Sequence, residues 1–224
     1  MGKLGMLLAC TLLVAAASDL APLEKKIASA VPECQVRFSF GSSGTLARQI
    51  IYGAEFDVFL AASRRYVDDI VKARAAEAET VRSYARGRIA VWSGKGISWK
   101  ALGSATRISL ANPVHAPYGL AAKQVLERQG LWRSVEAKVV FAENIRQAFQ
   151  FAVTRNTDAT LTAWTLVHDK GGELLPESWH DPILQTAVIP KRSTNPATAA
   201  QLVKWLTSAA GQKVLAAAGL MPVR

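Results

Sequence analysis

Ser42 and Ser43 lie in a short glycine-rich turn (residues 41–44) whose residue types are suited to holding an oxyanion. Residues 36–40 before the turn alternate between apolar and polar side chains, as in a half-buried strand, and the residues from Thr45 onward have the apolar spacing of a helix. A helix that begins directly after a strand leaves its first N–H groups unpaired, and its dipole attracts negative charge to that end. We therefore expect the N–H groups and uncharged hydroxyls of this turn to bind an anion.

Three other strand-to-helix junctions share this design. In each, turn residues present the start of a helix directly after an expected strand, at residues 18–19, 112–119 and 142–145. Anion binding at these junctions does not require a Lys or Arg side chain. The carboxyl ends of neighbouring parallel strands form one edge of a sheet, where α/β proteins bind ligands. The four helix N-termini can therefore converge on one small dianion and neutralise it by dipoles alone.

The remaining sequence alternates between expected strands and expected helices. Strands are expected at 11–17, 36–40, 57–61, 88–92, 107–111, 138–141, 159–164 and 186–189. Helices are expected to begin at 21 and 45 and to span 65–76, 119–129, 144–153, 196–207 and 210–218. Repeated βα units of this kind predict parallel sheets with ligands at the carboxyl ends of the strands.

The composition is that of a folded protein and argues against nucleic-acid binding. The chain has 224 residues, 50% of them hydrophobic, which is enough for one large domain or two small ones. Its formal net charge of +10 comes from 27 Lys and Arg against 17 Asp and Glu. The basic residues are scattered and are not interleaved with aromatic residues, so no base-stacking platform is expected. The excess charge is expected on solvated faces, where it attracts anions at long range.

The first residues of the chain allow two interpretations. Residues 1–17 carry one Lys and an apolar run, as in a secretory signal, and residues 7–10 resemble a lipoprotein processing box ending at Cys10. The favoured interpretation is a core strand at 11–17 after a residual or truncated export signal at about 1–10, with lipid anchoring through Cys10 left open. Cys10 and Cys34 lie near the starts of neighbouring strands. A disulfide between them is one outcome, but we expect packed free thiols.

Two other kinds of site explain these residues less well. Residues 41–45 resemble a nucleophile elbow, but Thr45 replaces its last glycine and no downstream Asp and His pair stands out to activate a serine. We therefore expect no enzyme activity. His168 and His180 lack the Cys or carboxylate spacing of a metal site, and His115 is expected to be a structural loop residue.

Taken together, these motifs resemble one known family. The matching segments follow the family's order along nearly the whole chain, at 15–18, 40–50, 53–60, 84–88, 112–119 and 143–145. They are similar to the periplasmic molybdate-binding proteins of bacterial ABC transporters. The resemblance implies an α/β fold with two Rossmann-like lobes joined by a two-strand hinge, the type II periplasmic-binding-protein architecture. It places lobe 1 at residues 1–84, lobe 2 at 85–184 and the return to lobe 1 at 185–224.

The same resemblance implies a function and a set of contacts. The protein is expected to capture molybdate, and tungstate as well, and to deliver it as a periplasmic or exported monomer to an ABC permease, with no cofactor and no nucleic-acid partner. Ser18 and Ser43 match the positions whose hydroxyl and N–H groups contact the oxyanion. Tyr118 matches a backbone donor after a proline, and Ile145 matches the donor that opens a later helix. Molybdenum or tungsten is expected only as the bound oxyanion. A binding protein for sulfate or phosphate is the alternative.

Three further residues are candidate contacts. Ser42 lies beside Ser43 in the same turn. Trp164 lies where the family often has a Tyr whose hydroxyl reaches the ligand, and packing is favoured over donation for its indole. Asp19 would repel a dianion if its side chain pointed inward, so it is expected to cap the first helix with only its N–H near the site. Asp19 is also the nearby carboxylate that a phosphate site would need as an acceptor.

Overall fold

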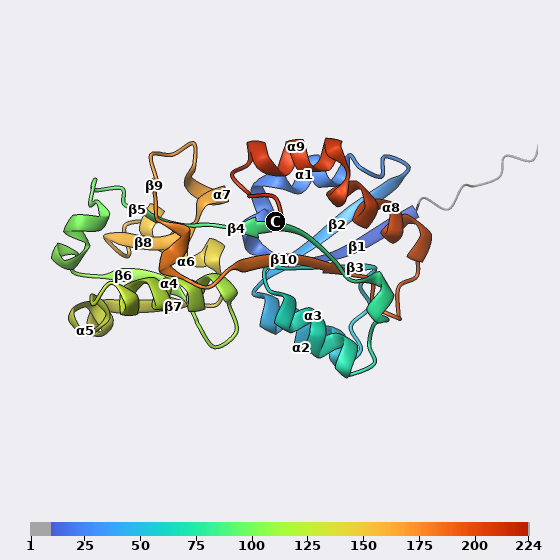
Figure 1. Cartoon of the computed structure of the whole chain (residues 1–224), viewed down its shortest axis with the longest axis horizontal. Coiled ribbons are helices and arrows are strands. Elements are labelled where there is room, and N and C mark those ends of the chain that lie inside the picture. The colour runs from blue at the N-terminus through green and yellow to red at the C-terminus, as the bar shows by residue number, and fades with distance from the viewer. Residues whose placement is uncertain (1–9, 224) are drawn as a thin grey trace, which may run out of the picture.

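The protein consists of two α/β lobes, each built on a five-stranded sheet, as the computed structural model shows for residues 10–223 (Figure 1). The strand order is β2-β1-β3-β10-β4 in the first sheet and β7-β6-β8-β5-β9 in the second. This confirms the predicted two-lobed α/β class. The export signal predicted at about 1–10 lies outside the described residues, apart from Cys10. Within the described part of the chain, no helix is long and apolar enough to cross a membrane.

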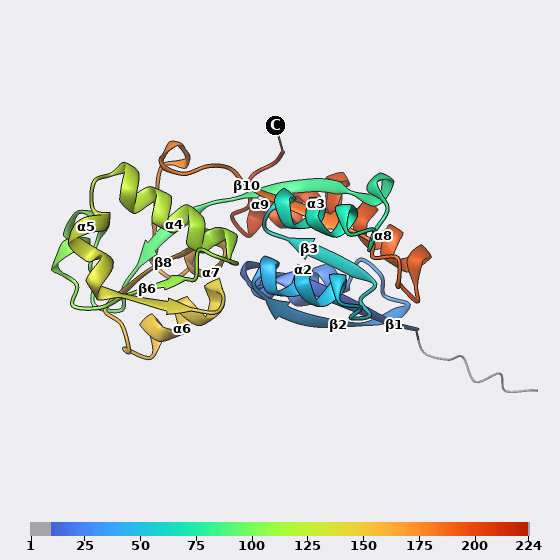
Figure 2. The same cartoon turned by 90° about the horizontal axis from the view of Figure 1, so that it is seen from below.

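In the first sheet four strands run in one direction and one strand, β10, runs in the opposite direction. Its strands are β1 (Cys10–Ala17), β2 (Cys34–Gly41), β3 (Val58–Ala61), β4 (Arg82–Gly87) and β10 (Ile183–Val188). β1 lies between β2 and β3, parallel to both, whereas β10 pairs antiparallel with β3 and β4. One face is covered by α2 (Ser43–Ile51) and α3 (Arg64–Lys72), and the other by α1 (Glu24–Ala28), α8 (Pro196–Thr207) and α9 (Ala209–Ala217) (Figures 1 and 2). The central strand β1 is buried over Val14–Ala17 because helices cover both faces.

The second sheet has the same mixed character. Its strands are β5 (Ile89–Trp92), β6 (Ile108–Ala111), β7 (Val139–Ala142), β8 (Ala159–Ala163) and β9 (Glu173–Leu174). Its helices are α4 (Pro117–Arg128), α5 (Trp132–Val135), α6 (Ile145–Val153) and α7 (Trp164–Val167), and Figure 2 shows α4 and α6 on opposite faces of the sheet.

Short 3₁₀ helices occur in both lobes. They are η1 (Ser18–Leu23), η2 (Ala78–Thr80), η3 (Trp99–Ser104), η4 (Glu136–Lys138) and η5 (Glu177–Trp179).

Two chain crossings join the lobes, and they explain why the predicted parallel sheets each contain antiparallel pairs as well. The chain passes from β4 straight into β5 through Arg88, and it returns to the first sheet with β10. Figure 1 shows β4 and β10 side by side at this junction. A strand that enters or leaves a sheet at a crossing need not follow the direction set by βα units, so β10 and β5 run antiparallel to their partners. β4 was not predicted as a strand, since Arg82, Ser83, Arg86 and Gly87 interrupt its apolar pattern.

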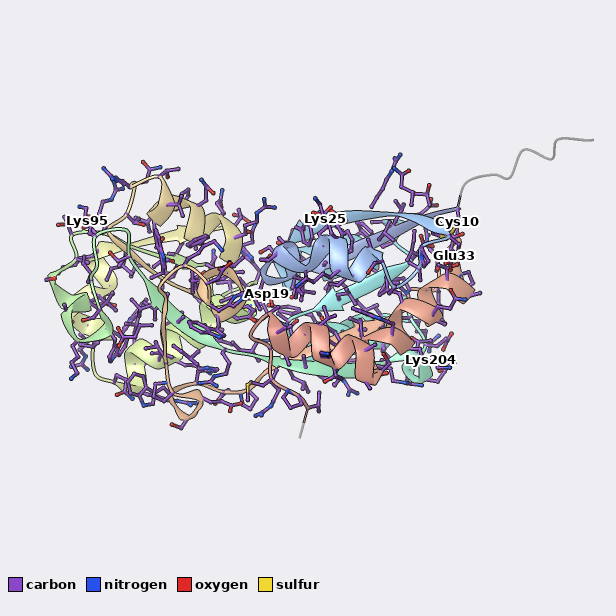
Figure 3. All side chains as sticks on the ribbon, turned by 90° about the horizontal axis from the view of Figure 1, so that it is seen from above. Cys10, Asp19, Lys25, Glu33, Lys95 and Lys204 are labelled. Atoms are coloured by element: carbon purple, nitrogen blue, oxygen red, sulfur yellow. A yellow bond between two sulfur atoms is a disulfide. The ribbon has the colours of Figure 1, made fainter. Side chains whose placement is uncertain are left out.

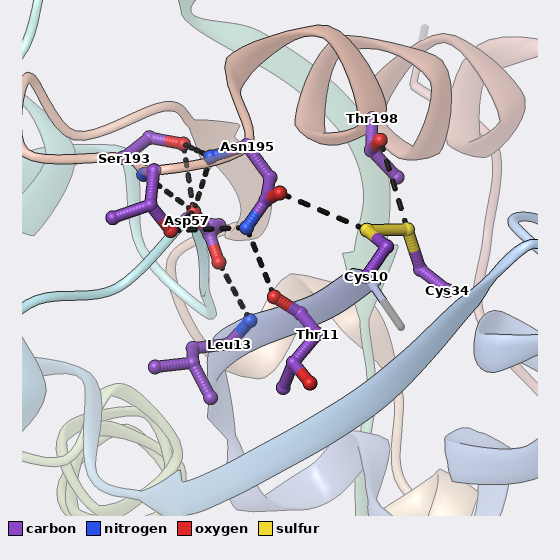
Figure 4. Close-up of a disulfide and its surroundings, with 9 residues drawn as sticks. Cys10, Thr11, Leu13, Cys34, Asp57, Ser193, Asn195 and Thr198 are labelled. Carbon is purple, nitrogen blue, oxygen red and sulfur yellow. Dashed lines mark hydrogen bonds between the residues drawn. A yellow bond between two sulfur atoms is a disulfide. The ribbon is translucent and has the colours of Figure 1, made fainter. Parts of the chain in front are cut away.

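The two cysteines form a disulfide, which corrects the prediction of free thiols (Figure 4). Cys10 and Cys34 are directly opposite in the parallel register of β1 and β2, which sets their Cα atoms 4.5 Å apart. That separation is within the range a disulfide can bridge. The bond occupies the Cys10 sulfur that a lipid thioether would need.

Loss of this disulfide should lower stability without disturbing the lobes' architecture. The bridge closes a loop with a sequence separation of 24 residues. A loop of this length restricts the unfolded chain enough to be worth about 3 kcal/mol. We expect the Cys10→Ser, Cys34→Ser protein to unfold at a lower urea concentration, and wild-type protein in reductant to behave alike. An unfolding midpoint in the double variant equal to that of the oxidised wild type would show that the bond does not form.

Candidate oxyanion site between the lobes

A small cavity lies where the four predicted strand-to-helix junctions meet. Its lining comes from both lobes: Ala17, Ser18, Asp19, Gly41, Ser42, Ser43, Ala62, Ala116, Pro117, Tyr118 and Ile145. The space inside it that a water-sized sphere can enter is only about 10 Å³. Because roughly 10–15 Å³ of such space holds a single water, the closed lobes exclude any large ligand from this cavity.

The two serines predicted to contact the anion can each donate their hydroxyl proton to a ligand. Ser43 Oγ accepts a hydrogen bond of 2.9 Å from the backbone N–H of Ala62, and Ser18 Oγ accepts one of 3.4 Å from the N–H of Arg146. Both serine side chains are buried in the cavity wall. A hydroxyl carries one proton and two acceptor lone pairs. With lone pairs engaged by backbone donors, each hydroxyl proton can point at a ligand oxygen.

Backbone N–H groups supply the remaining donors. Ser43 and Ile145 are the first residues of α2 and α6, and Tyr118 is the second residue of α4 after Pro117. The first N–H groups of a helix have no partner within the helix. Proline at the first helical position has a helical φ angle, and the N–H that it lacks would have had no partner within the helix. The first residues of three helices thus line the cavity. Their dipoles add partial positive charge at the same place.

Ser42 has a different role from its neighbour. Its Oγ accepts from Thr45 N–H at 3.4 Å as the N-cap of α2, and it lies 2.9 Å from His115 Nδ1. His115 Nε2 lies 3.7 Å from a Glu143 carboxylate oxygen. No pattern in the sequence predicted this Ser–His–Glu contact. Since Ser42 and His115 come from opposite lobes, the contact joins the lobes across the cleft.

Other hydrogen bonds across the cleft show that the lobes are closed on each other. Gly44 N–H donates to His115 C=O at 2.9 Å, and Tyr66 hydroxyl donates to Val114 C=O at 3.2 Å. A Cβ at Gly44 would lie 2.8 Å from the His115 oxygen and 2.9 Å from the Tyr66 ring, which explains the glycine.

Asp19 does not cap the first helix, which corrects the prediction for its side chain. Residue Ala17 is the N-cap of η1, and no side chain caps it. Asp19 Oδ2 instead accepts hydrogen bonds from Tyr118 hydroxyl at 2.9 Å and from Gln185 Nε2 at 2.6 Å. Gln185 Oε1 accepts in turn from Tyr84 hydroxyl at 3.3 Å. These four buried residues form one network that joins the lobes, because Tyr118 belongs to the second lobe and the others to the first.

Burial controls the protonation of this network. Desolvation raises the pKa of the Asp19 carboxyl to about 7, and the hydrogen bonds from Tyr118 and Gln185 offset only part of that effect. Burial, together with the nearby Asp19 carboxyl, raises the pKa of the Tyr118 and Tyr84 phenols well above their usual value, so both stay protonated. No Lys or Arg lines the cavity. The cavity therefore offers neutral donors and one weakly acidic carboxyl.

Trp164 lies outside the cavity lining, unlike the other six candidate contacts. It is the first residue of α7, and its ring packs against His168 with centroids 6.2 Å apart. A Cβ at Gly219, after α9, would lie 2.4 Å from the Trp164 ring. Trp164 thus packs between the second lobe and the C-terminal segment of the first. In the described part of the chain, no cluster of His, Cys, Asp and Glu is arranged to hold a metal ion.

Gln185 and Tyr84 are site residues that the sequence analysis missed. The available signal was a glutamine inside the mostly apolar strand at 183–188. A fully buried glutamine needs hydrogen-bond partners. Its partners are 101 and 166 residues away in sequence, so the signal indicated a polar contact but not which one.

Comparison with known proteins agrees with this geometry. Residues 12–221 match the family of bacterial extracellular solute-binding proteins. The chain is similar to a molybdate-binding protein of Azotobacter vinelandii, with 36% identity over 81% of this chain and 77% of the relative. A molybdate-binding protein of Rhodobacter capsulatus is 31% identical over 76% of this chain and 71% of its own.

Solved structures show the same similarity. The periplasmic molybdate-binding protein of Azotobacter vinelandii superposes with a TM-score of 0.89 and 27% identity, covering 95% of this chain and all of that one. A sulfate-binding protein of Mycobacterium tuberculosis has a TM-score of 0.75 at 16% identity, over 96% of this chain and 87% of its own, and thus shares the fold.

Gly87→Ala should hinder closure while leaving each lobe folded. A Cβ at Gly87 would lie 2.2 Å from the Tyr118 hydroxyl oxygen, which belongs to the opposite lobe. Such overpacking costs about 1–3 kcal/mol, and the shortest contact forms only when the lobes meet, whereas the 3.1 Å approach to Ile183 lies within the first sheet. We expect small-angle X-ray scattering to show less compaction on addition of an oxyanion than in the wild type.

Gly103→Ala is the matched control, because a Cβ at Gly103 has no neighbour within 4 Å. It should compact as the wild type does. If Gly87→Ala compacts equally well, the Tyr118 hydroxyl is not held against β4 in the closed state.

Proposed function

The chain belongs to the family of bacterial extracellular solute-binding proteins, and from this membership we propose that it captures molybdate in the interlobe cavity and delivers it to an ABC permease. A solute-binding protein performs no chemistry on its ligand, so the contact of Ser42 with His115 serves closure. The observation that carries the proposal is the small cavity between the lobes, which is lined by helix N-termini and two serine hydroxyls and by no Lys or Arg side chain.

The donor set supports a fully deprotonated oxyanion as ligand. Hydroxyl and N–H groups donate to every anion oxygen, and none of them requires a proton on the ligand. Hydrogen bonds to a charged acceptor are stronger than those between neutral groups. Tungstate has nearly the size and the charge of molybdate, so we propose that it binds as well. Sulfate is smaller, and donors placed for longer metal–oxygen bonds would contact it less well.

Closure links capture to delivery. The contacts of Asp19 with Tyr118, of Ser18 with Arg146 and of Gly44 with His115 all cross the cleft. An anion at the centre of these contacts adds further bonds to both lobes, so it favours the closed state over the open one. We propose that the permease recognises this closed, liganded form.

The protein is exported, as its family indicates, and the Cys10–Cys34 disulfide is of the kind that persists in oxidising compartments. We propose that it acts as a monomer in the periplasm, with no nucleic-acid partner and with no cofactor beyond the transported anion. Because the disulfide occupies the sulfur of Cys10, we propose no lipid anchor at this residue.

Molybdate and tungstate should raise the melting temperature far more than sulfate or phosphate. A ligand at a hundred times its Kd that binds only the folded protein adds about 2.7 kcal/mol of stability. A thermal-shift panel of the four anions on purified protein measures this directly. Equal stabilisation by sulfate would contradict selection by size, and no shift with any oxyanion would contradict the proposed function.

Ser43→Ala and Ser18→Ala should each weaken molybdate binding. Each substitution removes one hydrogen bond to a charged group, worth roughly 1.5–3 kcal/mol, or about ten- to a hundredfold in Kd. Calorimetric titration measures the loss. Trp164→Phe is the control, and we expect its Kd to stay near the wild-type value because Trp164 lies outside the cavity lining. Wild-type affinity in the double serine variant would show that the hydroxyls do not contact the anion.

A further inference from the structure

The two carboxylate oxygens of Asp19 have different surroundings. Oδ2 accepts from Tyr118 hydroxyl and Gln185 Nε2, at 2.9 and 2.6 Å. Oδ1 is buried and has no hydrogen-bond partner among the described residues, although Asp19 lines the cavity. Figure 3 shows Asp19 where the two lobes meet. A buried carboxyl oxygen without a partner is costly. A ligand in the cavity is the partner that the protein itself does not supply.

No cation within the described residues compensates a charge on Asp19. None of the ion pairs at residues 10–223 includes Asp19. The titratable groups that face it are the phenol of Tyr118 and, through Gln185, the phenol of Tyr84, and both stay neutral. His168, at the end of α7, packs edge-on against the Trp164 ring. The charged residues of the other elements that pack against η1 are all exposed to solvent: Glu24, Lys25, Lys26, Arg37 and Arg146.

An ionised Asp19 would therefore place a third negative charge beside a bound dianion. Like charges at close range in a buried site strongly disfavour the charged form of the group that can take up a proton. Burial alone already raises the pKa of Asp19 to about 7. The proton has one suitable position, since Oδ2 is occupied as an acceptor by two donors and Oδ1 is free.

We propose that Asp19 contacts the oxyanion as a neutral carboxylic acid, donating a hydrogen bond from Oδ1 to an anion oxygen, so that each captured dianion is accompanied by one proton. The proposal rests on the proposed function and adds a specificity-determining residue to the site. The proton comes from solvent and forms an O–H bond at Oδ1, and no bond in the anion breaks. Affinity for molybdate then falls as pH rises through the range in which the ligand-free protein loses this proton.

Proton uptake is measured by titrating molybdate into the full-length protein by calorimetry at pH 7.5, in MOPS and in Tris, whose ionisation enthalpies differ. We expect the difference in binding heat to correspond to about one proton taken up per anion. We also expect Kd to rise about tenfold between pH 7.5 and 8.5, since linkage of one proton gives a factor of ten per pH unit. Molybdate itself is fully deprotonated throughout this range.

Asp19→Asn keeps the shape of the side chain but removes the group that takes up the proton. The asparagine oxygen can take the place of Oδ2 as the acceptor for Tyr118 and Gln185, which leaves its NH₂ group facing the anion. We expect this variant to bind molybdate without proton uptake and with a Kd that does not change with pH. Asp169→Asn, in an exposed position, should retain the wild-type uptake and pH dependence.

The outcomes distinguish this proposal from the function on which it rests. Molybdate binding by the wild type with equal heats in both buffers would overturn the role of Asp19 and leave the function intact. Wild-type uptake persisting in Asp19→Asn would also overturn it, by assigning the proton to another group. Failure of the wild type to bind molybdate would overturn the function itself. The wild-type titration decides the proposal even if Asp19→Asn unfolds at a lower temperature.

Discussion

Holding a doubly charged anion in a buried cavity without a cation is the constraint on which the rest of this structure depends. Removing such an ion from water is expensive, so every group around it has to donate a hydrogen bond or carry partial positive charge. We propose that the protein meets this requirement with the N-termini of α2, α4 and α6 and with the hydroxyls of Ser18 and Ser43, which line the cavity. Backbone N–H groups donate to both serine oxygens, so each hydroxyl proton is available for a ligand.

The two-lobed fold follows from the same requirement. Helices that begin at the carboxyl ends of parallel strands in two separate sheets can surround an ion completely only when the sheets face each other. The chain brings them together by passing between sheets at β4 and β10, and the closed state is held by contacts that cross the cleft. Asp19, Tyr118 and Gln185 lie at the centre of those contacts, so the residues that close the lobes also set the charge of the site.

Local patterns made the donors predictable, whereas the contacts between distant segments could not be predicted. A strand, a small-residue turn and a helix start are adjacent in sequence, so Ser43, Tyr118 and Ile145 could be identified from spacing and family resemblance. The Asp19–Gln185 bond spans 166 residues and depends on how β10 returns to the first sheet. The disulfide depends on the register of β1 against β2, which spacing alone does not fix. The predictions of free thiols and of a capping role for Asp19 were wrong because each judged a residue by its neighbours in sequence.

The central claim is that a tetrahedral oxyanion binds between the lobes to uncharged donors. A crystal structure of the protein with molybdate, with diffraction collected at the molybdenum absorption edge, tests it most directly. We predict one anomalous peak enclosed by Ser18, Ser43, Tyr118 and Ile145, with oxygens within hydrogen-bond distance of the serine hydroxyls and the helix N–H groups. An empty cavity, or a peak only at surface lysine and arginine side chains, would contradict the account.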